Sequence, residues 1–539
     1  MSAEIGERFN ACEYLLDRRV HEGDGGRLAL TGPAGDLTYS ELLGLVTRTA
    51  AVLRELGLRP ERRVLMVMAD SPAFVAVYLA AMRIGAIPVP VSTMQRPGEL
   101  AELLRDSRTR LLAVTPEFAR LAAESAAEAP ELRGIVMAGS GSGGAADVGG
   151  NLPGESWPAG VGVHYLDALL ATAAPDDGEA VYQTTADSPA FWLYTSGTTG
   201  KSKAAMHRHG SVQVVCETYG SQVLGIRRQD RCLSAAKAFF AYGLGNSLLF
   251  PLSIGAATIL EPAPARPDLM ARRAADYGAT LFFGGPGFFA AMLRAGLPPD
   301  ALAGVRLAAS AGEALPAALY SRWTSHFGVD ILDGIGMTEM LHIFLSNAEG
   351  KVRPGSTGVA VPGYELRILD DDDIPVPDGT PGTLYVRGAS TATGYWCRYD
   401  ASRQVFQGEW LRTGDTYVRD ADGYFTCLGR TGDMLKAGGI WVSPAEVEER
   451  LLAHEAVAQA VVVAGLDSDG LEKPVAYVVP RPGATVTGEE LIEFCRVGLA
   501  AFKRPRRVIL TDAYPVTSTG KVRRVELRAQ ARALLTETA

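Results

Sequence analysis

The amino-acid sequence predicts an α/β protein with two domains. Its 539 residues exceed what one hydrophobic core normally contains, so at least two cores are expected. Between residues 37 and 91, amphipathic stretches at helical spacing alternate with apolar runs typical of buried strands. After Arg430 the pattern changes to a compact βαβ-like tail of about 110 residues, a normal size for a small domain. We therefore expect an N-terminal domain over residues 1–431 and a C-terminal domain over residues 432–539.

The alternation is clearest in the first third of the chain. LTYSELLGLVTRTAAVLRELG, from residue 37 to 57, has the spacing of an amphipathic helix, and RRVLMVMAD, from 62 to 70, has the apolar run of a buried strand. SPAFVAVYLAAMRIGA, from 71 to 86, predicts a second helix, and residues 98–115 continue the pattern. Residues 139–162 are rich in Gly, Ser and Pro and predict a surface loop.

Composition and charge exclude several classes of protein. A net charge of -9 argues against nucleic acid or an anionic membrane as the main partner. The first twenty residues show no basic segment followed by an apolar run, so no leader peptide is expected. Six cysteines without a CxxC pair favour reduced, mostly buried thiols. These features predict a cytoplasmic protein, and they leave a homodimer open.

The stretch YTSGTTGKSK, from Tyr194 to Lys203, has the composition of a polyphosphate-binding loop. Glycines let backbone N–H groups approach closely, hydroxyls donate hydrogen bonds, and lysines neutralise charge. A P-loop of the form GxxxxGK(S/T) is excluded, because Thr195 occupies the position of its first glycine. A flexible surface turn is the simpler alternative. The residues concerned are Thr195, Ser196, Gly197, Thr198, Thr199, Gly200, Lys201 and Lys203.

Two later stretches are candidates for substrate contacts. FFAYGLGNSLL, from residue 239 to 249, combines aromatic and small residues, although core packing is the commoner fate of such a cluster. SAGEALP and VDILDGIG precede Thr338 and Glu339. Glycines at a strand end let a planar ring lie against the backbone, and a carboxylate beside phosphates is a natural Mg²⁺ ligand. The alternative for Glu339 is a carboxylate at a helix N-terminus.

The last candidates lie in polar, glycine-containing segments. Residues 358–387 are β-rich, with the Asp370–Asp373 run predicting a solvated turn. Asp415 can accept hydrogen bonds from two ribose hydroxyls and Arg430 can hold sugar or phosphate, unless each forms only a surface ion pair. Lys521 lies in VTSTGKVRR and, taken alone, would be solvated surface.

Taken together and in order, these segments resemble the acyl-adenylate-forming superfamily of acyl-CoA synthetases, luciferases and adenylation domains, over nearly the whole chain. The family's phosphate loop reads (Y/T)(S/T)SG(S/T)TGxPKG, and this chain departs from it at Ser202 and Ala204. KAFFAYGLGNSLLFPLSIGA and ILDGIGMTEMLHIFLSN look like benzoate-CoA ligases and related aryl-CoA ligases. The resemblance implies a large N-terminal domain of mixed β-sheets flanked by helices, with a β-barrel-like subdomain, and a small mobile α+β C-terminal domain.

The resemblance also implies the reaction. ATP and Mg²⁺ would activate a small aromatic carboxylic acid as acyl-AMP, and coenzyme A would then take the acyl group, leaving AMP and pyrophosphate. Lys521, Thr338 and Glu339 would be catalytic, with Glu339 holding Mg²⁺. The nucleotide would be bound by Thr195, Ser196, Gly197, Thr198, Thr199, Gly200, Lys203, Gly312, Glu313, Ala314, Asp333, Gly334, Ile335, Asp415 and Arg430.

Three further groups of residues follow from the same resemblance. Gly432 stands where the hinge between domains normally carries an acidic residue, and glycine keeps rotation feasible. The CoA tunnel would use Lys436, Gly438, Gly439 and Trp441. The acyl pocket would be lined by Ala241, Tyr242, Ala311, Gly336, His342 and Ile343, whose small residues suit a flat ring.

Two other functions compete with the aryl-CoA ligase. A stand-alone adenylating enzyme would load the acyl group onto the phosphopantetheine arm of a carrier protein instead of CoA. A catalytically weakened relative would only bind an aryl acid or a nucleotide, and Ser202, Ala204 and Gly432 are its support. The presence of Lys521, Glu339, Asp415 and Arg430 together argues against it.

Overall fold

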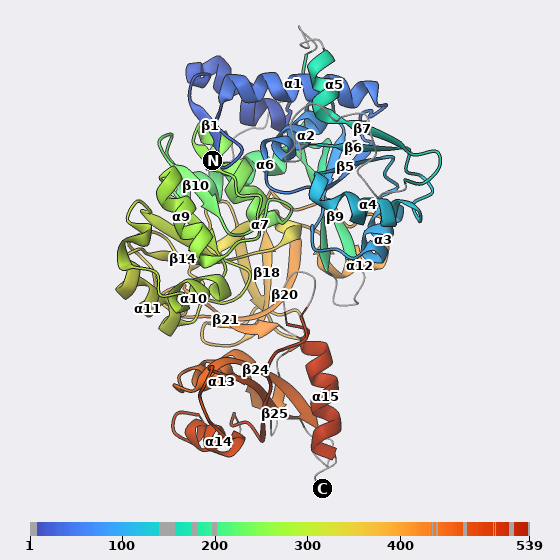
Figure 1. Ribbon diagram of the computed structural model, residues 1–539. Helices are drawn as coiled ribbons and strands as arrows, with labels where there is room; N and C mark the ends of the chain where they lie inside the picture. The colour runs from blue at the N-terminus through green and yellow to red at the C-terminus, as the bar shows by residue number, and fades with distance from the viewer. Residues whose placement is uncertain are drawn as a thin grey trace. The chain divides into compact units, whose positions relative to one another are not determined.

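The computed structural model divides into two compact units, each described separately (Figure 1). The large unit comprises residues 1–365 and 387–411, and the small unit residues 366–386 and 412–539. The expected boundary at residue 431 stays a prediction. The structure describes residues 8–138, 157–173, 180–196, 202–430, 432–433, 435–437, 440–466, 472–499, 501, 503–516 and 522–536.

The first sheet of the large unit is parallel throughout and has the order β4-β3-β5-β6-β7. The predicted helix, strand and helix between residues 37 and 86 are confirmed as α1 (Tyr39–Glu55), β3 (Arg63–Val67) and α2 (Pro72–Arg83). Thr38 and Glu41 form a capping box at the start of α1, and Ser71 caps α2. The other elements are β4 (Ile87–Pro90), α3 (Pro97–Ser107), β5 (Leu111–Val114), α4 (Ala119–Ala126), β6 (Gly134–Met137), β7 (Gly162–Tyr165) and α5 (Leu166–Thr172).

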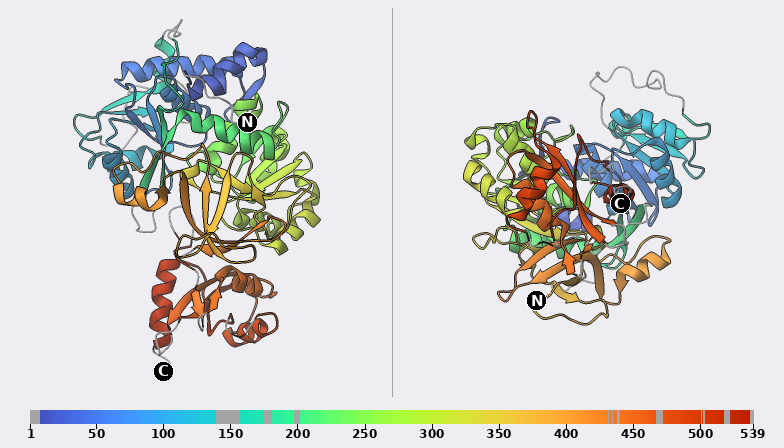
Figure 2. Two further views of the ribbon diagram at one scale, coloured as in Figure 1. Left: turned by 180° about the vertical axis from the view of Figure 1, so that it is seen from behind. Right: turned by 90° about the horizontal axis from the view of Figure 1, so that it is seen from below.

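The second sheet of the large unit has nine strands in the order β16-β15-β14-β13-β12-β10-β11-β1-β2. The strands from β14 to β1 run parallel, while β2, β15 and β16 pair antiparallel at the two edges. Figures 1 and 2 show this sheet beside the first, with α9, α10 and α11 over it. Its core contains Phe282, Phe289 and Trp323. Strands β12 and β13 are buried along their whole length, which is typical of a parallel sheet covered by helices.

The strands of this sheet are short, and helices fill the connections. The strands are β1 (Leu28–Thr31), β2 (Leu37–Thr38), β10 (Arg231–Ser234), β11 (Ala257–Ile259), β12 (Leu281–Gly284), β13 (Leu307–Ser310), β14 (Ile331–Gly336), β15 (Ile343–Ser346) and β16 (Val359–Ala360). The helices are α6 (His209–Val215), α7 (Ala241–Leu244), α8 (Phe250–Ile254), α9 (Pro267–Tyr277), α10 (Pro286–Arg294) and α11 (Ala317–Phe327), while α12 (Tyr399–Val405) lies later in the chain, between β18 and β19.

A separate antiparallel hairpin in the large unit consists of β8 (Pro189–Ser196) and β9 (Ser202–Arg208). Its register pairs Thr195 with Lys203 and Phe191 with His207. The segment from Thr393 to Trp396 continues the sheet beyond β9, since Ala205 forms a bridge with Tyr395. The backbone N–H of Trp396 also donates to the Ala204 carbonyl at 2.9 Å. Residues 190 positions apart in the sequence, Ala205 and Tyr395, therefore meet on the free edge of β9.

The small unit contains two groups of strands. One holds β18 (Gly382–Arg387), β20 (Trp410–Arg419) and β21 (Phe425–Arg430), with β17 (Glu365–Leu369) at one edge; β19 (Phe406–Gln407) pairs with the first residues of β20, which belong to the large unit. The other places α13 (Pro444–Leu452), α14 (Gly488–Arg496) and α15 (Arg524–Thr536) around β24 (Val457–Leu466), β25 (Glu472–Pro480) and β26 (Arg507–Leu510). β22 (Leu435–Ala437) and β23 (Ile440–Val442) form a short hairpin.

These elements confirm the α/β class, and most of the cysteines are buried, as expected. All six thiols are free, and four of them, Cys12, Cys216, Cys232 and Cys495, are buried. Within the part of the chain that the structure describes, no helix is long and apolar enough to cross a membrane.

Candidate functional site

The predicted phosphate loop is the connection of the β8–β9 hairpin. Thr195 and Ser196 end β8, and Lys203 lies one residue into β9, directly opposite Thr195. Ser202, which replaces the usual proline, pairs with Ser196 in the same ladder. Ala204, which replaces the usual glycine, is fully buried in the core of the first sheet. Both departures therefore have a place within the hairpin.

Thr338 and Glu339 belong to a short 3₁₀ turn, Thr338–Met340, that follows β14 directly. Each carbonyl of the turn is held by a different group. The Thr338 carbonyl lies 2.7 Å from Nε2 of His207, the Glu339 carbonyl accepts from the Ala392 N–H at 2.8 Å, and the Met340 carbonyl accepts from the Ser390 hydroxyl at 2.8 Å. A short turn with all its carbonyls engaged has little freedom to change conformation.

The side chain of Glu339 is buried and accepts a hydrogen bond from the hydroxyl of Tyr395. The ring of the same tyrosine lies 5.4 Å from the Lys203 ammonium, measured to the ring centroid. Among the described residues, no cation lies within ion-pair distance of Glu339, and no three His, Cys, Asp or Glu residues gather as a metal site. Glu339 therefore offers a single carboxylate whose charge is not compensated by a described neighbour.

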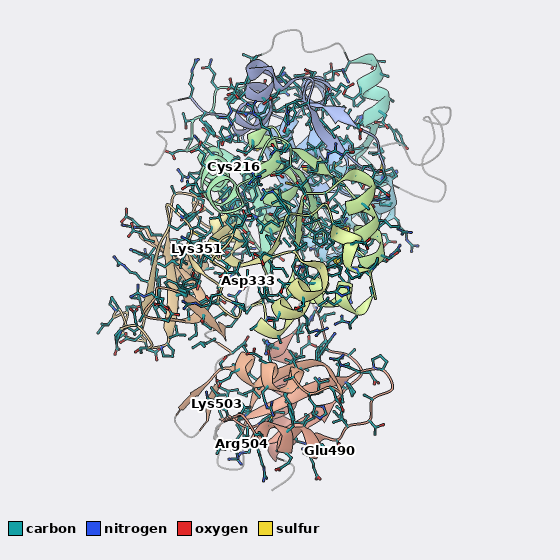
Figure 3. All side chains as sticks on the ribbon, turned by 90° about the vertical axis from the view of Figure 1, so that its left-hand side faces the viewer. Cys216, Asp333, Lys351, Glu490, Lys503 and Arg504 are labelled. Carbon is teal, nitrogen blue, oxygen red and sulfur yellow. The ribbon has the colours of Figure 1, made fainter. Side chains whose placement is uncertain are left out.

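The two segments expected beside adenine differ in exposure. Gly312, Glu313 and Ala314 form an exposed loop after β13, with Gly312 at a φ of 96°. Asp333 is 5% exposed and lies in the interior of the large unit, where Figure 3 labels it. Burial raises the pKa of Asp333 to about 8, against the opposing effect of the Leu315 N–H. The Asp333 side chain is thus mainly protonated at neutral pH.

The glycines Gly334 and Gly336 allow β15 to approach β14. A Cβ atom at Gly334 would lie 2.9 Å from Cγ2 of Ile343, and one at Gly336 would lie 2.6 Å from the His342 carbonyl oxygen. Both distances are too short for real contacts, so larger residues would push the strands apart. Packing between strands is therefore one reason for these glycines. Ile335 pairs with Leu345 in the same ladder.

The residues expected around the acyl group gather at the ends of β13, β14 and β15 and on α7. Tyr242 and Ala241 lie on α7. The Tyr242 hydroxyl donates to the carbonyl of Ala309 at 2.8 Å, and Ala309 is two residues before Ala311. His342 packs between the rings of Tyr219, Tyr242 and Phe250.

His342 is thus packed against aromatic rings. Burial lowers the pKa of His342 to about 3, which leaves the ring neutral at physiological pH. Its Nε2 atom lies 3.2 Å from the Tyr242 carbonyl. Ile343 is 1% exposed.

Asp415 and Arg430 lie opposite each other on β20 and β21 in the small unit. The Arg430 Nε lies 3.0 Å from Oδ1 of Asp415, and the Arg430 Nη1 also donates to the Thr413 carbonyl at 3.2 Å. The side chain of Asp415 is 11% exposed and that of Arg430 is 57% exposed. Asp415 and Arg430 thus form an ion pair with each other. The surface ion pair that the sequence left open for each of them is therefore one and the same pair.

Several predicted site residues lie outside the described part of the chain. These are Gly197, Thr198, Thr199, Gly200, Gly438, Gly439 and Lys521. The side chains of Ser196, Lys436 and Trp441 are likewise not described. Gly432 is exposed, and a Cβ atom added there would meet nothing within 4 Å.

Sequence reasoning did not single out His207 or Tyr395, although both contact the Thr338–Met340 turn. In the sequence, His207 lies 131 residues before Thr338, and Tyr395 lies 56 residues after Glu339. The available signals were the position of His207 four residues after Lys203, which places both on one face of a strand, and the aromatic pair Tyr395–Trp396 after a glycine.

Comparison with known proteins shows the family to which the chain belongs. The sequence matches the AMP-binding enzyme family over residues 16–396 and the AMP-binding enzyme C-terminal domain over residues 446–521. The chain therefore belongs to the AMP-binding enzyme family, and its large N-terminal and small C-terminal parts are those of this family.

Three relatives are similar over almost their whole length. A benzoate–CoA ligase of Thauera aromatica is 40% identical over 98% of this chain and 97% of its own. The crystal structure of the anthranilate CoA ligase AuaEII with anthranoyl-AMP has a TM-score of 0.89 and 35% identity, covering 98% of this chain and 99% of that one. A benzoate CoA ligase from Burkholderia xenovorans LB400 has a TM-score of 0.86 and 38% identity, covering 96% of this chain and 100% of that one.

Proposed function

We propose that this protein is an ATP-dependent acid–thiol ligase that converts a small aromatic carboxylic acid of the benzoate type into its CoA thioester. The observation that carries the proposal is the 40% identity to a benzoate–CoA ligase over 98% of this chain. The two crystal structures named above are described as a benzoate CoA ligase and an anthranilate CoA ligase. Which ring substituent this chain accepts is therefore a separate question.

In the first half-reaction, a carboxylate oxygen of the aryl acid attacks the α-phosphorus of ATP, and the bond to the β-phosphate breaks. Two anions must be brought together, and charge on the departing pyrophosphate must be stabilised. We assign Lys521 to bridge the carboxylate and α-phosphate oxygens, Thr338 to the α-phosphate, and Lys203 to the β- and γ-phosphates. The further phosphate-loop residues are Thr195, Ser196, Gly197, Thr198, Thr199 and Gly200.

The rest of the nucleotide is assigned to two further groups of residues. Adenine is assigned to the backbone of Gly312–Ala314 and of Asp333–Ile335, and ribose to Asp415. The ion pair between Arg430 and Asp415 fixes the position of that carboxylate, which suits an acceptor of two neutral hydroxyls.

Mg²⁺ fits the site as an ion held mainly by the nucleotide. Mg²⁺ is usually bound by one or two carboxylates together with substrate phosphates and water. Glu339 offers one such carboxylate, and its neutral partner Tyr395 leaves the negative charge available. When bound, Mg²⁺ would supply positive charge to the phosphates. Glu339 would be its protein ligand.

In the second half-reaction, the CoA sulfur attacks the carbonyl carbon of the acyl-adenylate, and the bond to the AMP oxygen breaks. The segment Lys436–Trp441, including Gly438 and Gly439, is assigned to the pantetheine arm. Gly432 is assigned to the hinge that exchanges this segment with the Lys521 loop. A cytoplasmic location and a homodimer stay predictions.

The acyl group is assigned to the pocket of Tyr242 and its neighbours. Small residues beside one aromatic ring suit a flat ring better than a long aliphatic tail. His342 contributes a neutral ring that closes this region between Tyr219 and Phe250. The other assigned residues are Ala241, Ala311, Gly336 and Ile343.

The test is formation of AMP and thioester from ATP, Mg²⁺ and CoA. Benzoate, its hydroxy and amino derivatives, heteroaryl acids and a medium-chain fatty acid would be compared. We expect thioester from a small aromatic acid and little from the fatty acid. Pyrophosphate release without CoA thioester would instead indicate loading of a carrier protein. Absence of both products would favour a binding or sensor protein.

A further inference from the structure

Strand β9 connects three groups of the nucleotide site. Lys203 lies near its start, His207 lies four residues later on the same face, and Tyr395 reaches the site from the segment bridged to Ala205. The hairpin that carries the phosphate loop is therefore continuous with the groups that contact the Glu339 turn.

His207 is placed to fix this turn rather than to contact substrate. Its ring is 1% exposed and lies against the ring of its cross-strand partner Phe191, with centroids 5.1 Å apart and planes inclined by 19°. A carbonyl oxygen can only accept a hydrogen bond, so Nε2 of His207 carries the hydrogen that it donates to the Thr338 carbonyl. The histidine thus links the phosphate-loop hairpin to the residue next to Glu339.

Tyr395 acts on the carboxylate itself. Its hydroxyl donates to Oε1 of Glu339, while its ring faces the Lys203 ammonium. The same tyrosine therefore contacts both the anion and a cation of the site. Without it, Lys203 and Glu339 could approach each other and neutralise each other's charge, which would weaken the attraction of both for a metal-bound polyphosphate.

We propose that His207 and Tyr395 are positioning residues that hold Glu339 ready for the Mg²⁺ of a bound nucleotide. His207 fixes the backbone of the turn, and Tyr395 fixes the direction and the free charge of the carboxylate. This inference rests on the proposed nucleotide-dependent function, and it assigns roles to two side chains that contact neither the nucleotide nor the aryl acid in the scheme above.

The first experiment measures ATP binding by isothermal titration calorimetry at a series of Mg²⁺ concentrations, without aryl acid. Tyr395→Phe removes only the hydroxyl and retains the ring. A hydrogen bond to a charged group is worth enough to change an equilibrium about tenfold or more. We therefore expect Tyr395→Phe to need about tenfold more Mg²⁺ for half-maximal ATP binding. Tyr395→Leu also removes the ring, and we expect a larger increase.

The second experiment compares two buried histidines of the same region. His207→Ala removes the donor to the Thr338 carbonyl. His209, two residues later, instead accepts from the Ala11 N–H at 3.0 Å, so His209→Ala controls for the loss of a buried imidazole. We expect His207→Ala to raise the Kd and KM for ATP about tenfold, with KM for the aryl acid unchanged. His207→Gln, whose amide can donate to the same carbonyl, should restore most of the affinity.

The outcomes separate this inference from the proposed function. Wild-type Mg²⁺ dependence in Tyr395→Phe, or equal losses in His207→Ala and His209→Ala, would overturn the positioning roles even if the wild-type enzyme forms aryl-CoA. Thermal unfolding of each variant identifies any that fail to fold, and the conservative Tyr395→Phe then decides the result. A wild-type protein that binds Mg·ATP but forms no aryl-adenylate would contradict the proposed function while leaving this test valid.

Discussion

Glu339 of the large unit and Asp415 of the small unit are two carboxylates with proposed binding roles, but their surroundings differ. The Glu339 side chain is held by a neutral tyrosine hydroxyl, whereas Asp415 lies 3.0 Å from the Arg430 guanidinium. Glu339 is carried by a 3₁₀ turn with all its carbonyls engaged, and Asp415 by an antiparallel ladder whose register shifts between Thr416 and Tyr417.

This difference shows how the group that contacts a carboxylate determines which kind of ligand the carboxylate can bind. A neutral donor fixes the position of a carboxylate and leaves its charge for a cation. An arginine compensates the charge, so the carboxylate is better suited to accept hydrogen bonds from neutral hydroxyls. The proposed roles of Glu339 at Mg²⁺ and of Asp415 at ribose follow from these two environments.

The largest effect is expected from Glu339→Gln, which keeps the shape of the side chain and removes its charge. Loss of one group that stabilises charge in the transition state costs about 10²–10³-fold in rate. We expect a loss of this size in pyrophosphate exchange, partly relieved by excess Mg²⁺. A variant with near-normal exchange at low Mg²⁺ would remove Glu339 from the metal site.

A second large effect is expected from Gly432→Pro, which should impair the second half-reaction and leave the first one intact. Proline fixes φ near −65° and should hinder rotation at the hinge. We expect pyrophosphate exchange to remain and thioester formation to fall at least about tenfold. Gly432→Ala is the matched control, since the added Cβ meets no atom within 4 Å. Equal loss of both steps in Gly432→Pro would refute the hinge.

A smaller effect is expected from Asp415→Ala, because it removes hydrogen bonds to neutral hydroxyls. We expect KM for ATP to rise about tenfold. If Asp415 binds ribose, the variant should lose less with 2′-deoxy-ATP than with ATP, whereas Glu339→Gln should lose equally with both. The same loss of Asp415→Ala with both nucleotides would assign this carboxylate to structure alone, through Arg430.

The smallest effect concerns Asp333, a third carboxylate with no cation within ion-pair distance among the described residues. Because burial raises its pKa to about 8, the folded state binds a proton that the unfolded state releases near pH 4. Its contribution to stability is complete below pH 4 and is lost as the pH rises towards 8. The slope is at most about 1.4 kcal/mol per pH unit.

Asp333→Asn should flatten this pH dependence. Chemical denaturation of wild type and variant at pH 5 and pH 8 measures it, and the difference in unfolding free energy between them should change across this interval. Parallel behaviour of the two proteins would mean that Asp333 is ionised in the folded state.

The sequence by itself determined the α/β class, the first helices and strands, and the order of the site segments. These depend on periodicity and on residue types grouped within short stretches, as in YTSGTTGKSK and the capped helix after Thr38. The composition of such a stretch already limits its backbone and its chemistry. Membership of the AMP-binding enzyme family confirms that order.

Only the tertiary structure decided which groups hold the site residues in place. Tyr395 meets Glu339 because the segment 393–396 joins the edge of β9, and His207 meets Thr338 because the hairpin lies against that turn. Likewise, Gly334 and Gly336 are explained by the approach of β15. Such contacts join residues far apart in the chain, and their partners depend on how separate elements pack, which no local pattern of residues encodes.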